Sequence, residues 1–127
     1  MARRRSTTLT EAELRLMEVL WAKGRATVAE VTAALLPPAI AYNSVLTTMR
    51  ILEQKGFVAH EEVGRAFIYH AVVAREVAAR SAVGDLLTRF FGNNAGELAL
   101  KLIEQERPSS DELARLRALV ERYEERS

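Results

Sequence analysis

The sequence contains no cysteine, and this absence excludes several kinds of site. Without thiols the chain cannot form disulfides, hold zinc through thiolates, use a nucleophilic cysteine or sense oxidants through cysteine chemistry. It also lacks any apolar run near the roughly 20 residues that a membrane-spanning helix requires. The first residues include three arginines but not the apolar stretch of a secretory signal. We therefore expect a cytoplasmic protein.

Residues typical of catalytic and metal sites are also scarce. The two histidines are His60 and His70; an antiparallel hairpin would bring them near each other, but a zinc site would still need ligands such as Glu61 or Glu62. No Ser/His/Asp arrangement, phosphate-binding glycine loop or paired-carboxylate motif is recognisable. The sequence predicts neither an enzyme nor a bound metal or cofactor.

The composition is that of a globular chain with a hydrophobic core, since 49% of the 127 residues are hydrophobic and 28% are charged. This length accommodates one ordinary domain, or a small DNA-binding module with a helical extension. The net charge of +1 does not by itself indicate nucleic-acid binding. Arg3, Arg4 and Arg5, however, form a basic segment that is a candidate DNA-binding arm.

Capping residues predict three helices in the first half of the chain. Two pairs match the capping box that begins a helix: Thr10 with Glu13, and Thr27 with Glu30. A third helix is expected from about Tyr42 to Lys55, ending at Gly56. The second and third helices are separated by a short turn-like segment, which is helix-turn-helix spacing.

A β-hairpin is predicted after the third helix. Residues 57–62 and 66–71 are rich in aromatic and branched side chains and flank Val63-Gly64-Arg65. Three helices followed by such a hairpin indicate a mainly α-helical chain that begins with a winged helix-turn-helix DNA-binding domain. We assign this domain to residues 1–72.

The third helix has two different faces when residues are placed at 100° intervals. One face is mainly apolar and includes Val45, Met49 and Leu52. The opposite face is polar and carries no acidic residue: Asn43, Thr47, Arg50 and Gln54. These side chains offer amides for adenine, a hydroxyl and methyl for thymine or phosphate, and a guanidinium for guanine or phosphate. Any solvated helix surface has such a face, so the DNA interpretation depends on the helix-turn-helix context.

Further DNA contacts are predicted around this helix. Arg65, at the tip of the hairpin, is suited to a phosphate or the minor groove, and is equally explained as a solvated turn residue. Tyr42 and Ser44, at the start of the helix, are suited to bind phosphate through their hydroxyls. Ser44 is equally compatible with a helix cap.

Residues 73–127 are predicted to form a helical dimerisation domain. Helical periodicity returns at residue 73 and predicts three helices: 73–91, 97–106 and 110–124. Their apolar residues are too numerous for three short helices without a partner surface, and the twin chain of a symmetric repressor provides one. The predicted dimerisation residues are Val77, Leu87, Phe90, Phe91, Leu98, Leu102, Leu116, Leu119, Val120 and Tyr123.

Four segments resemble the penicillinase-repressor family of winged-helix repressors, the BlaI/MecI type. These segments are residues 9–21 (LTEAELRLMEVLW), 27–31 (TVAEV), 42–56 (YNSVLTTMRILEQKG) and 67–69 (FIY). The resemblance is close over residues 7–72, and the tail is alike in length and helix pattern. It implies a homodimeric repressor that binds double-stranded, dyad-symmetric operators, often with TACA/TGTA-like half-sites, ahead of β-lactamase or other antibiotic and stress-response genes.

The resemblance also implies a mode of induction. In well-studied members a membrane metalloprotease sensor detects β-lactam and leads to cleavage of the tail at an Asn-Phe bond. This chain has Lys101-Leu102 at the matching position. The copper-responsive branch has a cysteine cluster that is absent here.

Two other functions fit the same pattern of elements. A ligand-responsive winged-helix regulator would have a pocket beneath Phe90 and Phe91, bordered by Tyr123. A winged helix that binds another protein would show no dependence on DNA sequence at the polar face of the third helix.

Overall fold

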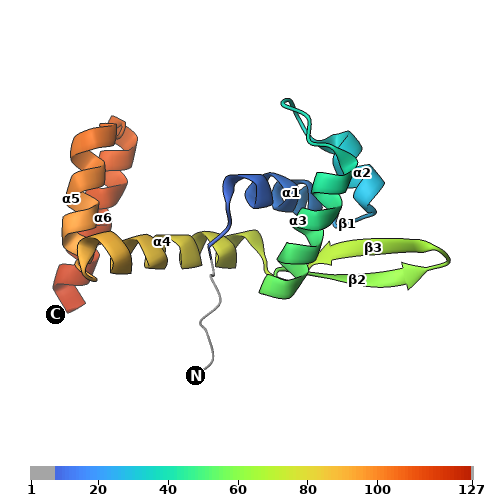
Figure 1. Cartoon of the computed structure of the whole chain (residues 1–127). Coiled ribbons are helices and arrows are strands. Elements are labelled where there is room, and N and C mark those ends of the chain that lie inside the picture. The colour runs from blue at the N-terminus through green and yellow to red at the C-terminus, as the bar shows by residue number, and fades with distance from the viewer. Residues whose placement is uncertain (1–7, 127) are drawn as a thin grey trace, which may run out of the picture. The chain divides into compact units, whose positions relative to one another are not determined.

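The computed structural model describes residues 8–126. These residues form six helices and a small antiparallel sheet of three strands (Figure 1). In chain order the elements are α1 (Glu11–Lys23), β1 (Arg25–Ala26), α2 (Val28–Ala34), α3 (Tyr42–Lys55), β2 (Val58–Val63), β3 (Ala66–Ala71), α4 (Arg75–Phe91), α5 (Ala95–Glu106) and α6 (Ser110–Arg126).

The chain divides into two compact units within α4, between Asp85 and Leu86. We call them the first unit, up to Asp85, and the second unit, from Leu86 onward. The predicted boundary between the DNA-binding domain and the dimerisation domain, between residues 72 and 73, differs from this division and stays a prediction. Among the described helices, none is both long and apolar enough to cross a membrane.

The first unit has the predicted winged helix-turn-helix architecture. Helices α1, α2 and α3 precede the β2–β3 hairpin, and β3 is the central strand of the sheet, with order β1-β3-β2. The two-residue strand β1 was not predicted; it pairs Arg25 with His70 and Ala26 with Tyr69. Both predicted capping boxes are formed, because each threonine hydroxyl accepts an amide hydrogen bond and each glutamate caps its threonine in return.

The core of the first unit lies where the three helices meet the sheet. Each of the three helices and the sheet contributes fully buried side chains to this core: Leu16, Met17 and Leu20 of α1, Val31 of α2, Val45, Met49 and Leu52 of α3, and Tyr69 of β3. On α1 the apolar side chain of Leu14 is exposed, whereas Glu13 is buried. Trp21 lies at the margin of the core, where its indole N–H donates to the carbonyl of Val73 at 2.9 Å.

An ion pair explains why a carboxylate is tolerated in this core. Lys55 Nζ, at the end of α3, lies 2.8 Å from Glu13 Oε1 in α1, and their side chains are only 20% and 5% exposed. The same Oε1 accepts the backbone N–H of Thr10 at 2.8 Å. One glutamate therefore caps α1 and ties it to α3, because a buried carboxylate requires both hydrogen bonds and a countercharge.

The second unit is built largely from α5 and α6. Figure 1 shows these two helices side by side, with opposite chain directions. Helix α5 begins at Ala95, two residues before its predicted start, and Asn94 caps it. Ser109 and Glu112 form a capping box at the start of α6. The structure buries no residue of α6, although the helix carries a stripe of apolar side chains.

Candidate nucleic-acid interface

Helix α3 presents its polar face to solvent. Val45, Met49 and Leu52 are fully buried, which fixes the rotation of the helix about its axis. The four residues predicted to read bases are all exposed: Asn43, Thr47, Arg50 and Gln54. The Thr47 hydroxyl donates to the carbonyl of Asn43 at 2.9 Å, so its methyl group and oxygen lone pairs remain for outside contacts.

The segment between α2 and α3 is held by an arginine from α1. The Arg15 guanidinium donates to the carbonyl of Leu36 at 2.6 Å and to the carbonyl of Pro38 at 2.5 Å. Two carbonyls on one guanidinium fix the path by which the chain enters α3. The start of α3, and with it Tyr42 and Asn43, is thereby positioned relative to α1.

The beginning of α3 lacks a side-chain cap. Its N-cap is Ala41, so the alternative in which Ser44 caps the helix is wrong. Tyr42 and Ser44 are exposed in the first turn. Because the first amides of a helix have no carbonyl partner within it, this end of α3 combines outward N–H groups with two hydroxyls.

The carboxylate of Glu53, near the end of α3, is held by the hairpin. His60 of β2 places Nδ1 at 2.7 and 2.9 Å from the two oxygens of Glu53. The imidazole stacks on Phe67, with ring centroids 4.4 Å apart and planes at 15°, and also contacts Tyr69 at 5.3 Å. Sequence reasoning missed this contact between Glu53 and His60, since no local signal pairs a helix residue with a strand residue.

The phenol of Tyr69 lies beneath the same part of α3. Burial raises the pKa of Tyr69, the Glu53 carboxylate raises it further, and the Arg50 guanidinium acts in the opposite sense. Tyr69 is 1% exposed. The last turns of α3 thus lie next to a buried, neutral tyrosine of the central strand β3.

The hairpin has two faces with different partners. His60 pairs in register with Tyr69, and Ala59 pairs with His70, so the two histidines lie on opposite faces of the hairpin. The expectation that antiparallel pairing brings them together is therefore wrong. Among the described residues no group of three or more candidate ligands is positioned to hold a metal ion.

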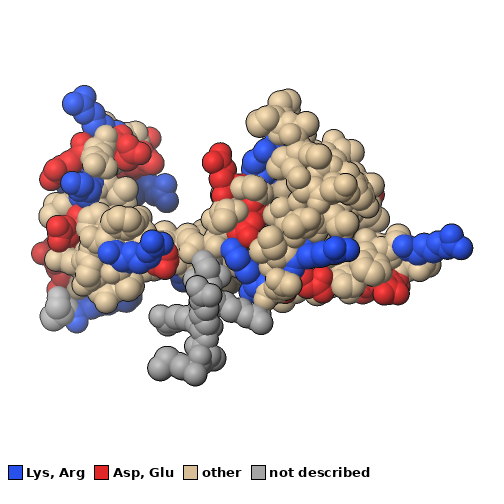
Figure 2. All heavy atoms as spheres, viewed as in Figure 1, with Lys and Arg blue, Asp and Glu red and all other residues tan. Residues whose placement is uncertain are grey.

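Basic side chains lie beside α3 and at the end of the hairpin in the view of Figure 2. Arg65 is exposed in the turn between β2 and β3, where the sequence predicts it. Arg25 pairs with Glu61 at 3.1 Å, on the face of the hairpin away from His60. The predicted arm of Arg3, Arg4 and Arg5 lies outside the described residues.

The residues predicted to form the dimer differ in exposure. Leu98 is 8% exposed and therefore already packed within the chain. Leu87 and Phe91 are partly buried. The other seven are exposed: Val77, Phe90, Leu102, Leu116, Leu119, Val120 and Tyr123.

Comparison with known proteins identifies the family. The family described as "Penicillinase repressor" matches residues 9–122. The chain belongs to this family. The penicillinase repressor family consists of DNA-binding transcriptional repressors and not of enzymes. The penicillinase repressor of Bacillus licheniformis is 24% identical over 119 residues, which cover 93% of each chain.

Two solved structures share the fold of this member of the penicillinase repressor family. The solution structure of the DNA binding domain of the repressor BlaI has a TM-score of 0.50 and 24% identity, covering 58% of this chain and 90% of that one. The crystal structure of YusO from Bacillus subtilis has a TM-score of 0.54 and 15% identity, covering 94% of this chain and 77% of that one. At these identities the likeness shows the winged-helix fold alone.

Proposed function

We propose that this repressor binds a dyad-symmetric operator as a homodimer, with residues 1–72 contacting DNA and residues 73–127 joining the two copies. The observation that carries the proposal is the exposed face of α3. It presents two amides, a threonine and an arginine, and the adjacent carboxylate of Glu53 is held by His60. This is the surface that a recognition helix needs in the major groove.

Each side chain on this face has a chemically defined role in the proposal. Asn43 and Gln54 present amides that pair with adenine, and Arg50 presents a fork that pairs with guanine. Thr47 contributes a methyl group that can contact the methyl of thymine. Its hydroxyl oxygen can also accept a hydrogen bond from a donor that is itself bound to a phosphate. Leu46 packs against the core, whereas Ile51 is exposed beside Arg50 in the sequence and is available for a thymine methyl.

Phosphate contacts would fix the register of α3 on the duplex. In this proposal the phosphates of one DNA strand are bound by the first amides of α3 together with Tyr42 and Ser44. Arg65 contacts the DNA backbone or the minor groove beside the site. The segment Arg3-Arg4-Arg5 would follow the duplex as a basic arm. Such contacts are independent of sequence and make affinity depend on salt concentration.

The apolar face of the second unit supports the homodimer. Leu116, Leu119, Val120 and Tyr123 follow the i, i+3, i+4, i+7 spacing of one helix stripe, yet all four are exposed. An exposed stripe of this kind marks an interaction surface. A second copy of the chain is the occupant we propose, because a dyad-symmetric operator requires two heads related by a two-fold axis.

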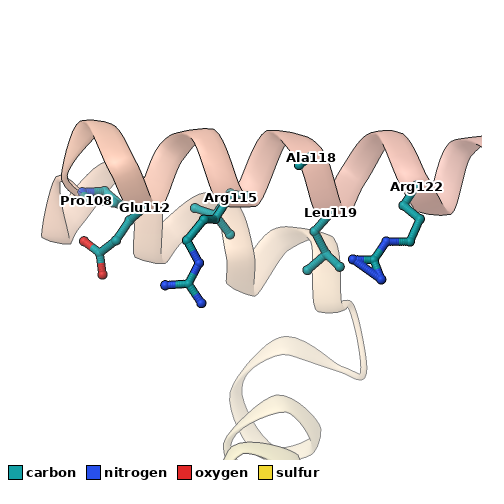
Figure 3. A pocket seen from close by; sticks show the side chains of 7 residues that line it. Pro108, Glu112, Arg115, Ala118, Leu119 and Arg122 are labelled. Carbon is teal, nitrogen blue, oxygen red and sulfur yellow. The ribbon is translucent and has the colours of Figure 1, made fainter.

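A groove along α6 adds shape and charge to this surface. Its volume is about 570 Å³, and Figure 3 shows Glu112, Arg115, Leu119 and Arg122 extending to the same side of the helix. The acidic side chain of Glu112 thus lies at the start of the groove, and the basic side chains of Arg115 and Arg122 follow it among apolar ones. A two-fold pairing can match the acidic start of one α6 with the basic middle of its copy, which favours a self-complementary interface.

Occupation of the operator by the dimer would exclude transcription from the promoter. We propose β-lactamase or other antibiotic and stress-response genes as the targets, as the family resemblance implies. A membrane metalloprotease sensor or its effector protease would then end repression by separating the two heads, since linked heads bind far better than one. Cleavage at Lys101-Leu102 is not favoured, because this bond lies in the middle of α5 and proteases prefer exposed loops.

The test is a titration of the full chain against two duplexes of about 30 bp, long enough for two half-sites one helical turn apart. One duplex comes from the promoter of its own gene and carries inverted TACA/TGTA-like half-sites, and the other has the same bases scrambled. We expect tight, salt-sensitive binding to the first. Arg50→Ala should weaken that binding by about 10- to 100-fold, the effect of losing one bidentate base contact.

Arg80→Ala is the matched control, because it removes the same charge from an exposed position of α4, outside α3 and the hairpin. We expect this variant to keep the preference for the operator. Equal, weak binding of the unchanged protein to both duplexes would refute the proposal and favour the protein-interaction function.

A further inference from the structure

We propose that His60 is a positioning residue for operator binding: it holds the Glu53 carboxylate against the hairpin and away from the phosphates of bound DNA. This inference deepens the proposed function and rests on it. The recognition helix carries a single acidic residue, Glu53, and that residue lies one turn beyond Arg50. A carboxylate at this place opposes the approach of DNA unless something neutralises or redirects it.

The contacts of His60 are suited to that role. A carboxylate only accepts hydrogen bonds, so Nδ1 carries a proton and donates it toward Glu53. The distances of 2.7 and 2.9 Å show that the nitrogen is centred on both carboxylate oxygens. The side chains of His60 and Glu53 are 26% and 36% exposed, so the pair lies at the margin of the interface and not in open solvent.

The imidazole itself is held from the sheet. It stacks on Phe67 at 4.4 Å and contacts Tyr69 at 5.3 Å, and both aromatic residues belong to β3. Tyr69 is buried in the core, whereas Phe67 extends the same face of the hairpin toward its tip. The hairpin therefore determines the orientation of the imidazole ring, and the ring in turn fixes the position of the Glu53 carboxylate through its hydrogen bond.

Loss of the imidazole would release the carboxylate. A freed Glu53 side chain can turn toward solvent, which is where the phosphates lie in the proposed complex. Repulsion between two unit charges about 8 Å apart in a partly screened environment weakens binding by roughly fivefold. The hairpin would also lose this polar attachment to α3.

The experiment measures operator affinity for a set of variants of the full chain, with the two duplexes described above. His60→Ala removes the donor, and His60→Gln retains an amide donor as the conservative replacement. Glu53→Gln in the His60→Ala background removes the charge that His60 is proposed to control. Glu61→Gln in the same background is the matched control, since it removes one carboxylate from the opposite face of the hairpin.

We expect His60→Ala to bind the operator about fivefold more weakly at low salt, and the deficit to shrink at high salt because repulsion between exposed charges is screened. His60→Gln and the double variant His60→Ala/Glu53→Gln should both return to within about twofold of the unchanged protein. His60→Ala/Glu61→Gln should remain as weak as His60→Ala. A thermal unfolding curve of each variant accompanies the titration.

Three results would overturn the inference. They are unchanged affinity in His60→Ala, no recovery in the double variant with Glu53→Gln, and equal recovery with Glu61→Gln. If His60→Ala weakened binding only by destabilising the fold, the second substitution would not restore operator affinity, because removing another polar group does not stabilise a destabilised protein. If the unchanged protein does not prefer the operator, the proposed function fails instead.

Discussion

Replacing Glu13 by glutamine should destabilise the first unit, because the carboxylate is the link between α1 and α3. Glu13 Oε1 accepts hydrogen bonds from Lys55 Nζ and from the backbone N–H of Thr10, each at 2.8 Å. Glutamine keeps an oxygen for the Thr10 amide but removes the charge. Hydrogen bonds to charged groups contribute about 1.5–3 kcal/mol, and we expect the lower value because Lys55 can turn into water. The thermal midpoint should fall by about 6–12 °C.

The loss should depend on pH in a defined direction. Burial acts to raise the pKa of Glu13, but the hydrogen bonds from Lys55 and Thr10 outweigh burial and lower the pKa below its ordinary value. The unfolded chain therefore binds this proton more readily than the native protein does. The stabilisation is present above the unfolded pKa, about 4.3, and is lost as the pH falls through the lower native pKa. The difference between Glu13→Gln and the unchanged protein should be full at pH 7 and should shrink as the pH falls through the lowered native pKa.

Glu30→Gln is the control for this prediction. Glu30 forms the same capping box with Thr27, but its carboxylate is exposed, and within residues 8–126 no lysine is seen hydrogen-bonded to it. The assay is circular dichroism of the full chain on heating, at one protein concentration because dimerisation would otherwise shift the midpoint. Equal losses for the two variants at pH 7, or a Glu13→Gln deficit that does not change with pH, would refute the role of the ion pair.

Three further outcomes are expected. Leu119→Glu should convert the proposed dimer to monomer in sedimentation velocity, whereas a change at Leu36, which is 80% exposed in the first unit, to glutamate should not; a dimer in both variants would count against the α6 surface. Gly56→Ala should lower the free energy of unfolding by about 1–2 kcal/mol, because Gly56 has φ 87° and an alanine is strained there, and an unchanged urea midpoint would contradict this. Limited proteolysis of the native chain, followed by mass spectrometry, should show no cut between Lys101 and Leu102; an early cut at that bond would show that α5 opens readily.

Much of the first unit could be predicted from the sequence because its signals are local. The capping boxes at Thr10 and Thr27 depend on residues three apart, and the left-handed end of α3 depends on Gly56 alone. The hairpin follows from a glycine turn between two runs of branched and aromatic residues. Helical periodicity also placed Val45, Met49 and Leu52 on the buried face of α3, since burial follows directly from the 3.6-residue repeat.

Other features were decided by contacts between segments far apart in the chain. Glu13 and Leu14 are neighbours in the sequence, yet the carboxylate is buried and the leucine is exposed. The burial of Glu13 depends on its ion pair with Lys55, which lies far away in the sequence. The two residues of β1 form a strand only because β3 offers an open edge beside them.

The candidate DNA surface likewise has one feature that the sequence predicts and another that depends on tertiary contacts. The sequence by itself determined that α3 carries a polar face without a carboxylate at its centre, because that face follows from residue identity and helical geometry. Only the tertiary structure decided how Glu53 is restrained, since the register of β2 with β3 places His60, Phe67 and Tyr69 on one face of the hairpin. Register and helix docking are set by the packing of the whole core, and no local run of residues encodes them.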